Sequence, residues 1–115
     1  MPRKNTDSRD RVERREDALR PCPYLGYDRD RLAMHLVERG AYEIAETQFR
    51  RAVWLNPFEP RFKMHLAWCL YKQGRHTDAL ACLAEVPDAE TDADMHTIVR
   101  LIKQGVSKKP IEGGR

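Results

Sequence analysis

Cysteine and histidine are the residue types of this chain with the most reactive side chains, because thiolates and imidazoles serve as nucleophiles, general bases and zinc ligands. The chain has cysteines at positions 22, 69 and 82, and histidines at positions 35, 65, 76 and 96. None of these cysteines forms a C-x-x-C pair, and the histidines do not stand at zinc-ligand spacing. Nor does the spacing place a Ser or Cys nucleophile beside a histidine. We therefore expect no metal, no cofactor and no enzymatic activity.

One short string is less ordinary. Cys22-Pro23-Tyr24-Leu25-Gly26 is either a turn that leads into a helix, a docking peptide or a reactive-thiol site. Its Pro and Gly favour the turn. A Gly-rich phosphate loop of the form G-x-x-x-x-G-K is absent from the sequence.

The net charge of +3 is concentrated at the two ends of the chain. Residues 1–20 carry seven basic and five acidic side chains, and residues 104–115 carry three and one. The body between them has eleven basic and twelve acidic side chains. A nucleic-acid surface needs a basic cluster on the folded part, so this distribution disfavours a nucleic-acid partner.

The sequence also bears on the cellular compartment. The polar stretch after Met1 does not resemble a secretory signal. The longest apolar run, Leu66–Tyr71, is too short to cross a membrane. We expect a cytoplasmic protein that does not enter membranes.

Three segments follow from the pattern along the chain. Residues 1–26 are charged and poor in apolar side chains, which predicts disorder or a frayed helix. Residues 27–105 show helical periodicity, and residues 106–115 are expected to form a flexible tail. The expected helices run from Asp28, as N-cap, to near Gly40, and then over residues 42–55, 58–73, 76–85 and 91–104, with Gly105 as the last stop signal.

The helical part contains an internal repeat. Leu32 and Leu66, Ala33 and Ala67, Gly40 and Gly74, Ala45 and Ala79, and Phe49 and Leu83 each stand 34 residues apart. This period, the small residues, the glycine turns and Asn56-Pro57 together resemble the tetratricopeptide repeat family.

The resemblance implies an all-α fold, a short α-solenoid of antiparallel helix hairpins with about five helices. The repeats would span residues 27–57 and 58–88, with a capping helix at 91–104. Stable arrays usually need about three units. We therefore expect the chain to pair with itself, to dock on a partner, or to fold Pro21–Tyr27 back as a cover.

In this family the first helix of each hairpin lines a concave groove that binds peptides or proteins. Met64, Trp68 and Tyr71 form a stripe on the third expected helix, and Met34 and Val37 lie on the matching line of the first. Arg31, Arg61 and Lys72 flank this stripe. The alternative is that Met64, Trp68 and Tyr71 pack in the core. Family members that grip a C-terminal carboxylate have asparagines where this chain has Met34 and His65, which argues against that specialised role.

These observations predict a protein-interaction module, a scaffold or adaptor that binds a helical or extended partner segment in the groove. The first alternative is a small chaperone or assembly factor that shields an apolar helix of a client. The second is a nucleic-acid-associated protein that acts through its basic termini. A homo-oligomer is compatible with each of them.

Overall fold

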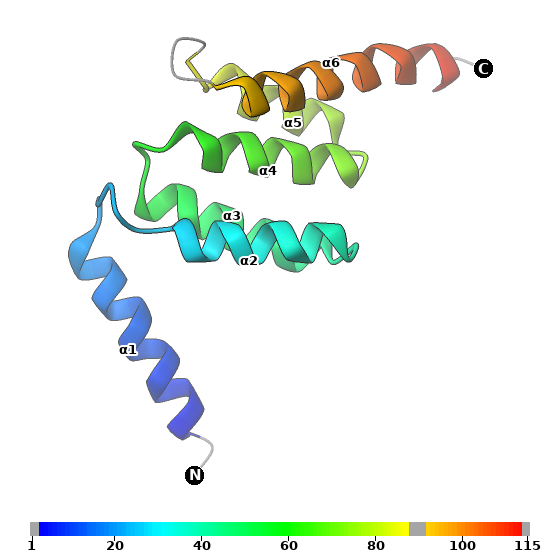
Figure 1. Cartoon of the computed structure of the whole chain (residues 1–115). Coiled ribbons are helices and arrows are strands. Elements are labelled where there is room, and N and C mark those ends of the chain that lie inside the picture. Colours follow the sequence, from blue (N-terminus) through cyan, green and yellow to red (C-terminus); the bar gives the residue numbers. More distant parts are fainter. Residues whose placement is uncertain (1–2, 88–91, 114–115) are drawn as a thin grey trace.

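A computed structural model of the protein describes residues 3–87 and 92–113, with side chains for residues 10–87 and 92–107. Every regular element in these residues is an α-helix, which confirms the predicted all-α solenoid. The helices are α1 (Arg3–Leu19), α2 (Tyr27–Glu38), α3 (Tyr42–Leu55), α4 (Pro60–Lys72), α5 (His76–Ala84) and α6 (Ala93–Gly113). Helices α2 to α6 form a layered stack, and α1 projects away from one end of it (Figure 1).

Two equivalent turns build the hairpins α2–α3 and α4–α5. Gly40 and Gly74 have φ values of 81° and 82°, the left-handed region in which glycine carries no steric cost. The Ala41 N–H donates to the Leu36 carbonyl at 2.9 Å, and the Arg75 N–H donates to the Leu70 carbonyl at 3.0 Å. Each turn therefore satisfies carbonyls that the preceding helix leaves free, at positions 34 residues apart.

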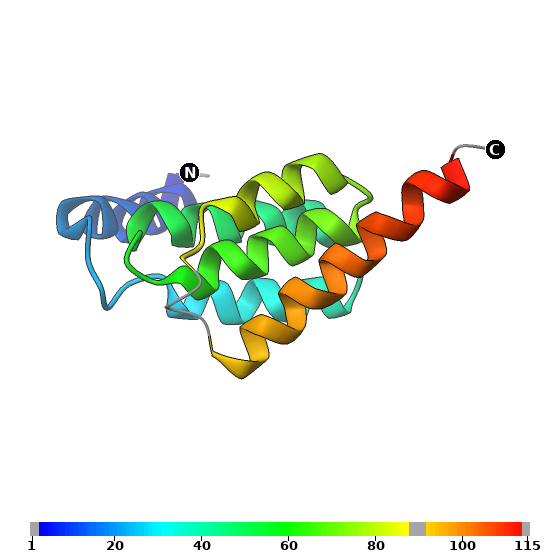
Figure 2. The ribbon, with the colours of Figure 1, turned by 90° about the horizontal axis from the view of Figure 1, so that it is seen from above.

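The small residues of the repeat let neighbouring helices approach closely. Ala33, Ala45, Ala67 and Ala79 are each completely buried. The large Phe49 fills the space between the first hairpin and α4, and it is also completely buried. Helix α4 packs against both α3 and α2, and α6 packs against both α5 and α4. Seen from above in Figure 2, α6 crosses the second hairpin obliquely and extends beyond it.

The segment between α1 and α2 folds back over the end of α3. This agrees with the sequence-based expectation that Pro21–Tyr27 could cover the repeats. The Cys22 N–H donates to the Leu55 carbonyl at 3.0 Å, and the buried Asn56 amide donates to the Leu25 carbonyl at 3.0 Å. The Leu25 N–H donates to the Cys22 carbonyl at 3.2 Å, so the string forms a turn. Gly26, not Asp28, is the N-cap of α2. Its φ is 95°, and a Cβ atom there would lie 2.7 Å from the Phe62 ring, so the position favours glycine.

Both ends of the chain differ from the sequence-based expectation. Residues 3–19 of the first segment, predicted to be disordered or a frayed helix, form the helix α1, whose carboxylates pair with arginines of the first hairpin. Helix α6 does not stop before Gly105 and continues to Gly113. Gly105 has no positive φ but lies against Tyr71, so it allows two helices to cross closely. The expected boundaries at Asp88 and Thr91 lie outside the described residues.

Candidate partner-binding surfaces

Two of the side chains predicted to line an open groove lie in the core instead. Met64 has 0% of its surface exposed and Val37 has 6%. Helix α6 packs over α4, and Met64 therefore joins the same apolar cluster as Leu83 and Ile102. The prediction that Met64 and Val37 offer an open binding surface is wrong, because α6 covers Met64 on α4 and Val37 packs into the same apolar cluster from α2. For Met64 the alternative, packing in the core, is confirmed.

Trp68 and Tyr71 are half-buried, and both pack against the core. Their ring centroids lie 5.6 Å apart, and the Lys72 ammonium lies 5.2 Å from the Trp68 ring centroid. A cation over an indole face contributes about 0.5–1 kcal/mol at an exposed site, so Lys72 helps to hold the ring. Met34, at the position of α2 equivalent to Trp68 in α4, is also half-buried. Part of the predicted stripe thus remains accessible.

Arg31 and Arg61, which were predicted to flank the stripe, differ in how strongly they pair with other side chains of the chain. The side chain of Arg31 is 72% exposed and lies 3.6 Å from Asp28, a geometry that contributes little to stability. Arg61 pairs with Asp92 at 3.2 Å and so joins α4 to the start of α6. The hydrogen bond from the Met95 N–H, assisted by Arg61, lowers the pKa of Asp92. Arg31 is therefore open to a partner, whereas Arg61 acts within the fold.

A buried contact between a histidine and a carboxylate, which the sequence did not suggest, links α2 and α4. The His65 Nδ1 atom lies 2.8 Å and 3.0 Å from the two carboxylate oxygens of Asp30. The side chains are only 13% and 11% exposed. Asp30 and His65 are 35 residues apart, one more than the repeat length, so they stand at neighbouring positions of consecutive repeats. This relation could have predicted their contact from the sequence.

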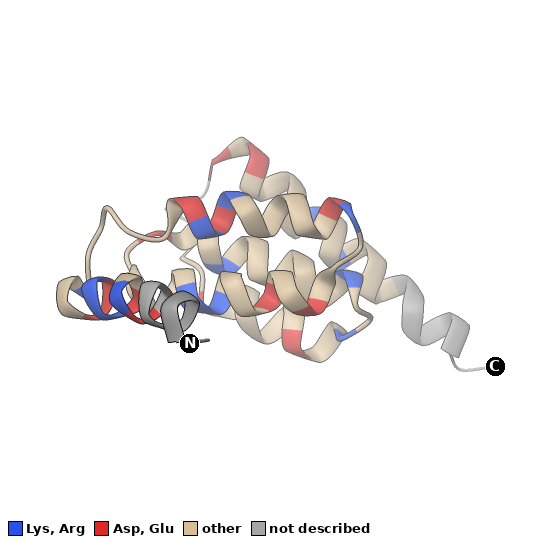
Figure 3. Ribbon diagram, turned by 90° about the horizontal axis from the view of Figure 1, so that it is seen from below, with Lys and Arg blue, Asp and Glu red and all other residues tan. Residues whose placement is uncertain are grey.

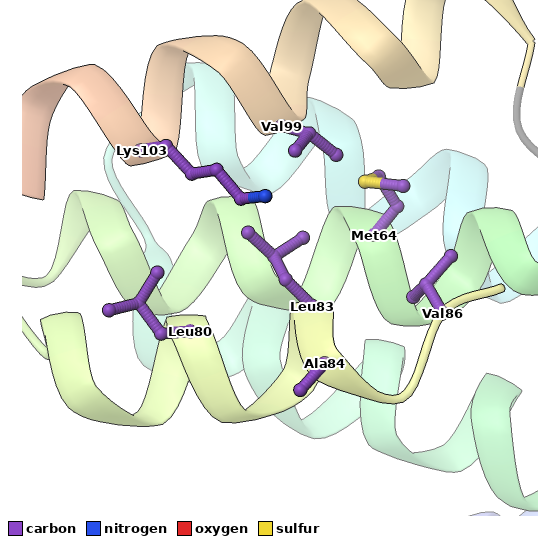
Figure 4. A pocket seen from close by; sticks show the side chains of 7 residues that line it. All are labelled: Met64, Leu80, Leu83, Ala84, Val86, Val99 and Lys103. Carbon is purple, nitrogen blue, oxygen red and sulfur yellow. The ribbon is translucent and has the colours of Figure 1, made fainter. Parts of the chain in front are cut away.

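A second surface is the α5–α6 cleft, which sequence reasoning did not predict. It has a volume of about 370 Å³ and is lined by Met64, Leu80, Leu83, Ala84, Val86, Val99 and Lys103 (Figure 4). Val99 and Lys103 point from α6 toward Leu80 and Leu83 of α5. Met64 forms the floor and has no exposed surface of its own.

A third surface, the Arg29–Arg51 site, is occupied by α1. Two nitrogens of Arg29 donate to the Glu16 carboxylate at 2.8 and 2.9 Å, and Arg51 pairs with Asp17 at 2.8 Å and with Glu16 at 3.1 Å. Figure 3 shows acidic and basic residues alternating along α1 where it approaches the stack. Burial raises the pKa of Glu16, but hydrogen bonds from the two arginines outweigh that effect and leave the pKa below its ordinary value. Beside them the Arg20 guanidinium lies 4.1 Å from the Trp54 ring centroid.

Cys69 and Cys82 pack in or against the apolar core. Cys69 is completely buried, its thiol donates to the Tyr42 carbonyl at 3.2 Å, and burial raises its pKa to about 11. Burial also raises the pKa of the Cys82 thiol. Within the described residues no cluster of His, Cys, Asp and Glu side chains could hold a metal ion. Nor does any helix of those residues have the length and apolar character that a membrane span requires.

The layered hairpins define a short helical-repeat scaffold, a class whose members present surfaces to other macromolecules. A family model described as tetratricopeptide repeat matches residues 31–93, more than half of the chain. The chain belongs to the tetratricopeptide repeat family, whose repeats are generally protein–protein interaction modules. No curated protein and no solved structure matches the chain.

Proposed function

We propose that the protein is an interaction module, a scaffold or adaptor, that binds a helical or extended segment of another protein on the α2–α4 face. This face comprises Arg31, Met34, Trp68, Tyr71 and Lys72. The observation that carries the proposal is Trp68, a half-buried indole held between Tyr71 and the Lys72 ammonium. Such a side chain is already ordered before a partner arrives, so binding costs little further entropy.

The chemistry of the face defines the partner segment. Trp68 and Tyr71 offer a rigid apolar surface, and Met34 has the flexible thioether that adapts to different shapes. Arg31 and Lys72 are exposed cations at either side of these residues. A segment with apolar anchors and neighbouring acidic side chains fits this combination.

The test begins with the tagged full-length chain in an extract of its host, from which bound proteins are identified by mass spectrometry. A purified candidate partner is then titrated against the wild type and two variants. We expect Trp68→Ala to weaken binding by at least roughly tenfold, because aromatic anchors dominate binding energy. The charge-reversed variant Arg31→Glu/Lys72→Glu should also bind weakly and lose much of its salt dependence.

Phe58→Ala is the matched control, because Phe58 is an aromatic residue that is 59% exposed and lies outside the α2–α4 face. Circular dichroism must show native helix content for each variant. Met64→Glu is unsuitable, since it would bury a charge in the core. Equal affinity of the wild type, Trp68→Ala and the charge-reversed variant would disprove binding at this face.

A further inference from the structure

The Arg29–Arg51 site brings together two guanidinium groups from α2 and α3, the helices of the first hairpin. The side-chain oxygen of Gln48 accepts a hydrogen bond from Arg29 at 2.8 Å and so orients its guanidinium group. Both arginine side chains are only 21% exposed, and both bind the same carboxylate, that of Glu16. Trp54, which is 42% exposed, borders the site beside Arg51. Two ordered guanidinium groups beside an indole ring are suited to bind acidic side chains.

Helix α1 occupies this site without filling it. A hollow of about 400 Å³ is lined by Glu13 of α1 and by Arg29, Thr47, Gln48 and Arg51 of the hairpin. Over residues 11–20, only Glu13 and Glu16 are half-buried, and every other residue is exposed. Helix α1 therefore meets the first hairpin along one narrow acidic face and projects away from the stack (Figure 1).

The charge of α1 is poorly matched to a site made of two arginines. Residues 3–19 carry six basic and five acidic side chains, so the helix as a whole is positively charged. Arg14 and Arg15 directly precede Glu16 and are exposed. Their charges oppose the attraction between α1 and the site. A segment with the same carboxylates and without these cations would therefore be attracted more strongly.

Helix α1 has the advantage of being tethered. Directly after it, the Arg20 Nε atom donates to the Trp54 carbonyl at 2.7 Å, and the Cys22 N–H donates to the Leu55 carbonyl at 3.0 Å. A short tether gives an attached segment an effective concentration on the order of millimolar, so a weak intrinsic affinity keeps α1 in place. A free ligand of higher affinity would displace it.

We propose that the Arg29–Arg51 site binds an acidic segment of a partner protein, which displaces α1. The segment would be a helix with two adjacent carboxylates, in the arrangement of Glu16 and Asp17, and with few basic residues beside them. Helix α1 then acts as an internal competitor that weakens the apparent affinity for the partner. The site shares no residue with the α2–α4 face, so the two proposals stand or fall independently.

A protein segment fits the site better than a nucleic acid or a second copy of this chain. Residues 21–103 carry eleven basic and twelve acidic side chains, so a long polyanion would meet no surrounding excess of positive charge. A second copy would offer only the same α1, with the same arginines beside its carboxylates. In addition, the contacts of Arg20 and Cys22 hold each α1 at its own hairpin.

The probe is a fluorescent synthetic peptide of residues 10–19 that carries Arg14→Ala and a helix-stabilising staple between positions 11 and 15. Both stapled positions are exposed in α1, and the staple replaces two further arginines. Binding to the full-length chain is measured by fluorescence anisotropy at low salt. A control peptide with the additional changes Glu16→Gln and Asp17→Asn should not bind measurably.

Glu16→Gln/Asp17→Asn in the full-length chain removes the carboxylates that hold α1, and we call this variant the released chain. It should bind the probe at least roughly tenfold more tightly than the wild type does, because the internal competitor is weakened. Adding Arg51→Gln to the released chain should weaken binding at least roughly tenfold, since charge-assisted hydrogen bonds are lost. Adding Arg50→Gln is the matched control, because Arg50 is the neighbouring residue of α3 and pairs with Glu46 instead. Its affinity should equal that of the released chain.

Several results would overturn the proposal. Absence of binding to the released chain would show that the site takes no free segment, and equal affinities of the wild type and the released chain would show that α1 does not compete. Equal losses with Arg50→Gln and Arg51→Gln would reduce the binding to non-specific attraction. Circular dichroism must show native helix content for each variant, which excludes unfolding as the cause of lost binding.

Two further measurements identify a different occupant. A single-stranded oligonucleotide that displaces the probe at lower concentration than unlabelled probe does would assign the site to nucleic acid. A wild-type dimer in analytical ultracentrifugation that Arg51→Gln converts to a monomer would assign it to a second copy. We expect neither result.

Discussion

The two helices at the ends of the helical stack, α1 and α6, are held in different ways. At the first hairpin, α1 is attached through ion pairs of Glu16 and Asp17 with Arg29 and Arg51. At the last hairpin, α6 buries apolar side chains, among them Met95 and Ile102. The apolar residues of α1, by contrast, stay in water, since Val12 and Leu19 are each 53% exposed.

This difference means that α6 is part of the folded core, whereas α1 is attached to its surface. Burial of an aliphatic side chain contributes about 1.5–3 kcal/mol, whereas an exposed ion pair contributes about 0–1 kcal/mol. Helix α6 therefore belongs to the cooperative unit of the fold. Helix α1 should open separately, at a much lower free energy.

The largest effect is expected for the apolar end. Ile102→Ala removes a side chain that is completely buried in α6 and leaves a cavity. It should lower the free energy of unfolding by about 2–5 kcal/mol, measured by urea denaturation. Leu101→Ala, at a neighbouring position that is 43% exposed, should change it far less. Similar losses in both variants would show that α6 is not part of the core.

The close crossing of α6 and α4 gives the next largest effect. A Cβ atom at Gly105 would overlap the hydroxyl of Tyr71 and would lie 2.7 Å from its Cε1 atom. Gly105→Ala should therefore destabilise the fold by about 1–3 kcal/mol through overpacking. Helix propensity alone predicts the opposite sign, a gain of about 1 kcal/mol. If urea denaturation showed Gly105→Ala to be more stable than the wild type, the close crossing of α6 and α4 would be contradicted.

The attachment of α1 to the first hairpin should weaken as the salt concentration rises. The Debye length falls from about 10 Å at 0.1 M salt to about 3 Å at 1 M, which screens the ion pairs of α1 where they meet water, as at Asp17, whose side chain is 50% exposed. Amide hydrogen exchange in α1 should accelerate between these concentrations, while exchange in α6 should change little. Arg51→Gln should accelerate exchange in α1 already at low salt, with at most about 1 kcal/mol lost in global stability. Salt-independent exchange in α1 would contradict this account.

The smallest effect concerns pH. Because the pKa of Glu16 is lowered in the fold from 4.5, its contribution to holding α1 is fully present above pH 4.5. That contribution is lost as the pH falls below this value through the folded-state pKa. Hydrogen exchange in α1, corrected for its intrinsic pH dependence, should report release in this acidic range. Glu16→Gln should remove most of the transition, and an unchanged transition would assign it to other groups.

The sequence predicts the parts of the fold that depend on local and repeated signals. The interval of 34 residues, the two glycine turns and the helix at residues 42–55 all agree with the structure. Gly105 shows the limit of such signals, because glycine both ends helices and allows close crossings. Only the packing of Tyr71 against it distinguishes these roles.

Contacts between distant residues explain the remaining differences. Met64 has the periodicity of a surface stripe, and its burial depends on a third layer that begins almost 30 residues later. Likewise α1 lacks apolar periodicity, and the arginines that hold it lie in the first hairpin. Neither feature can be read from a local pattern of residue types.

The most direct test of the proposed function is site-specific photo-crosslinking in the native host. Glu38 is exposed and occupies the position in α2 equivalent to Lys72 in α4, so a crosslinking residue there reports on the α2–α4 face without altering it. Ala81, exposed on α5, is the control position. We predict a defined adduct with one partner protein from position 38 that is absent from position 81. The same adducts from both positions, or an adduct from position 81 alone, would contradict binding at the α2–α4 face.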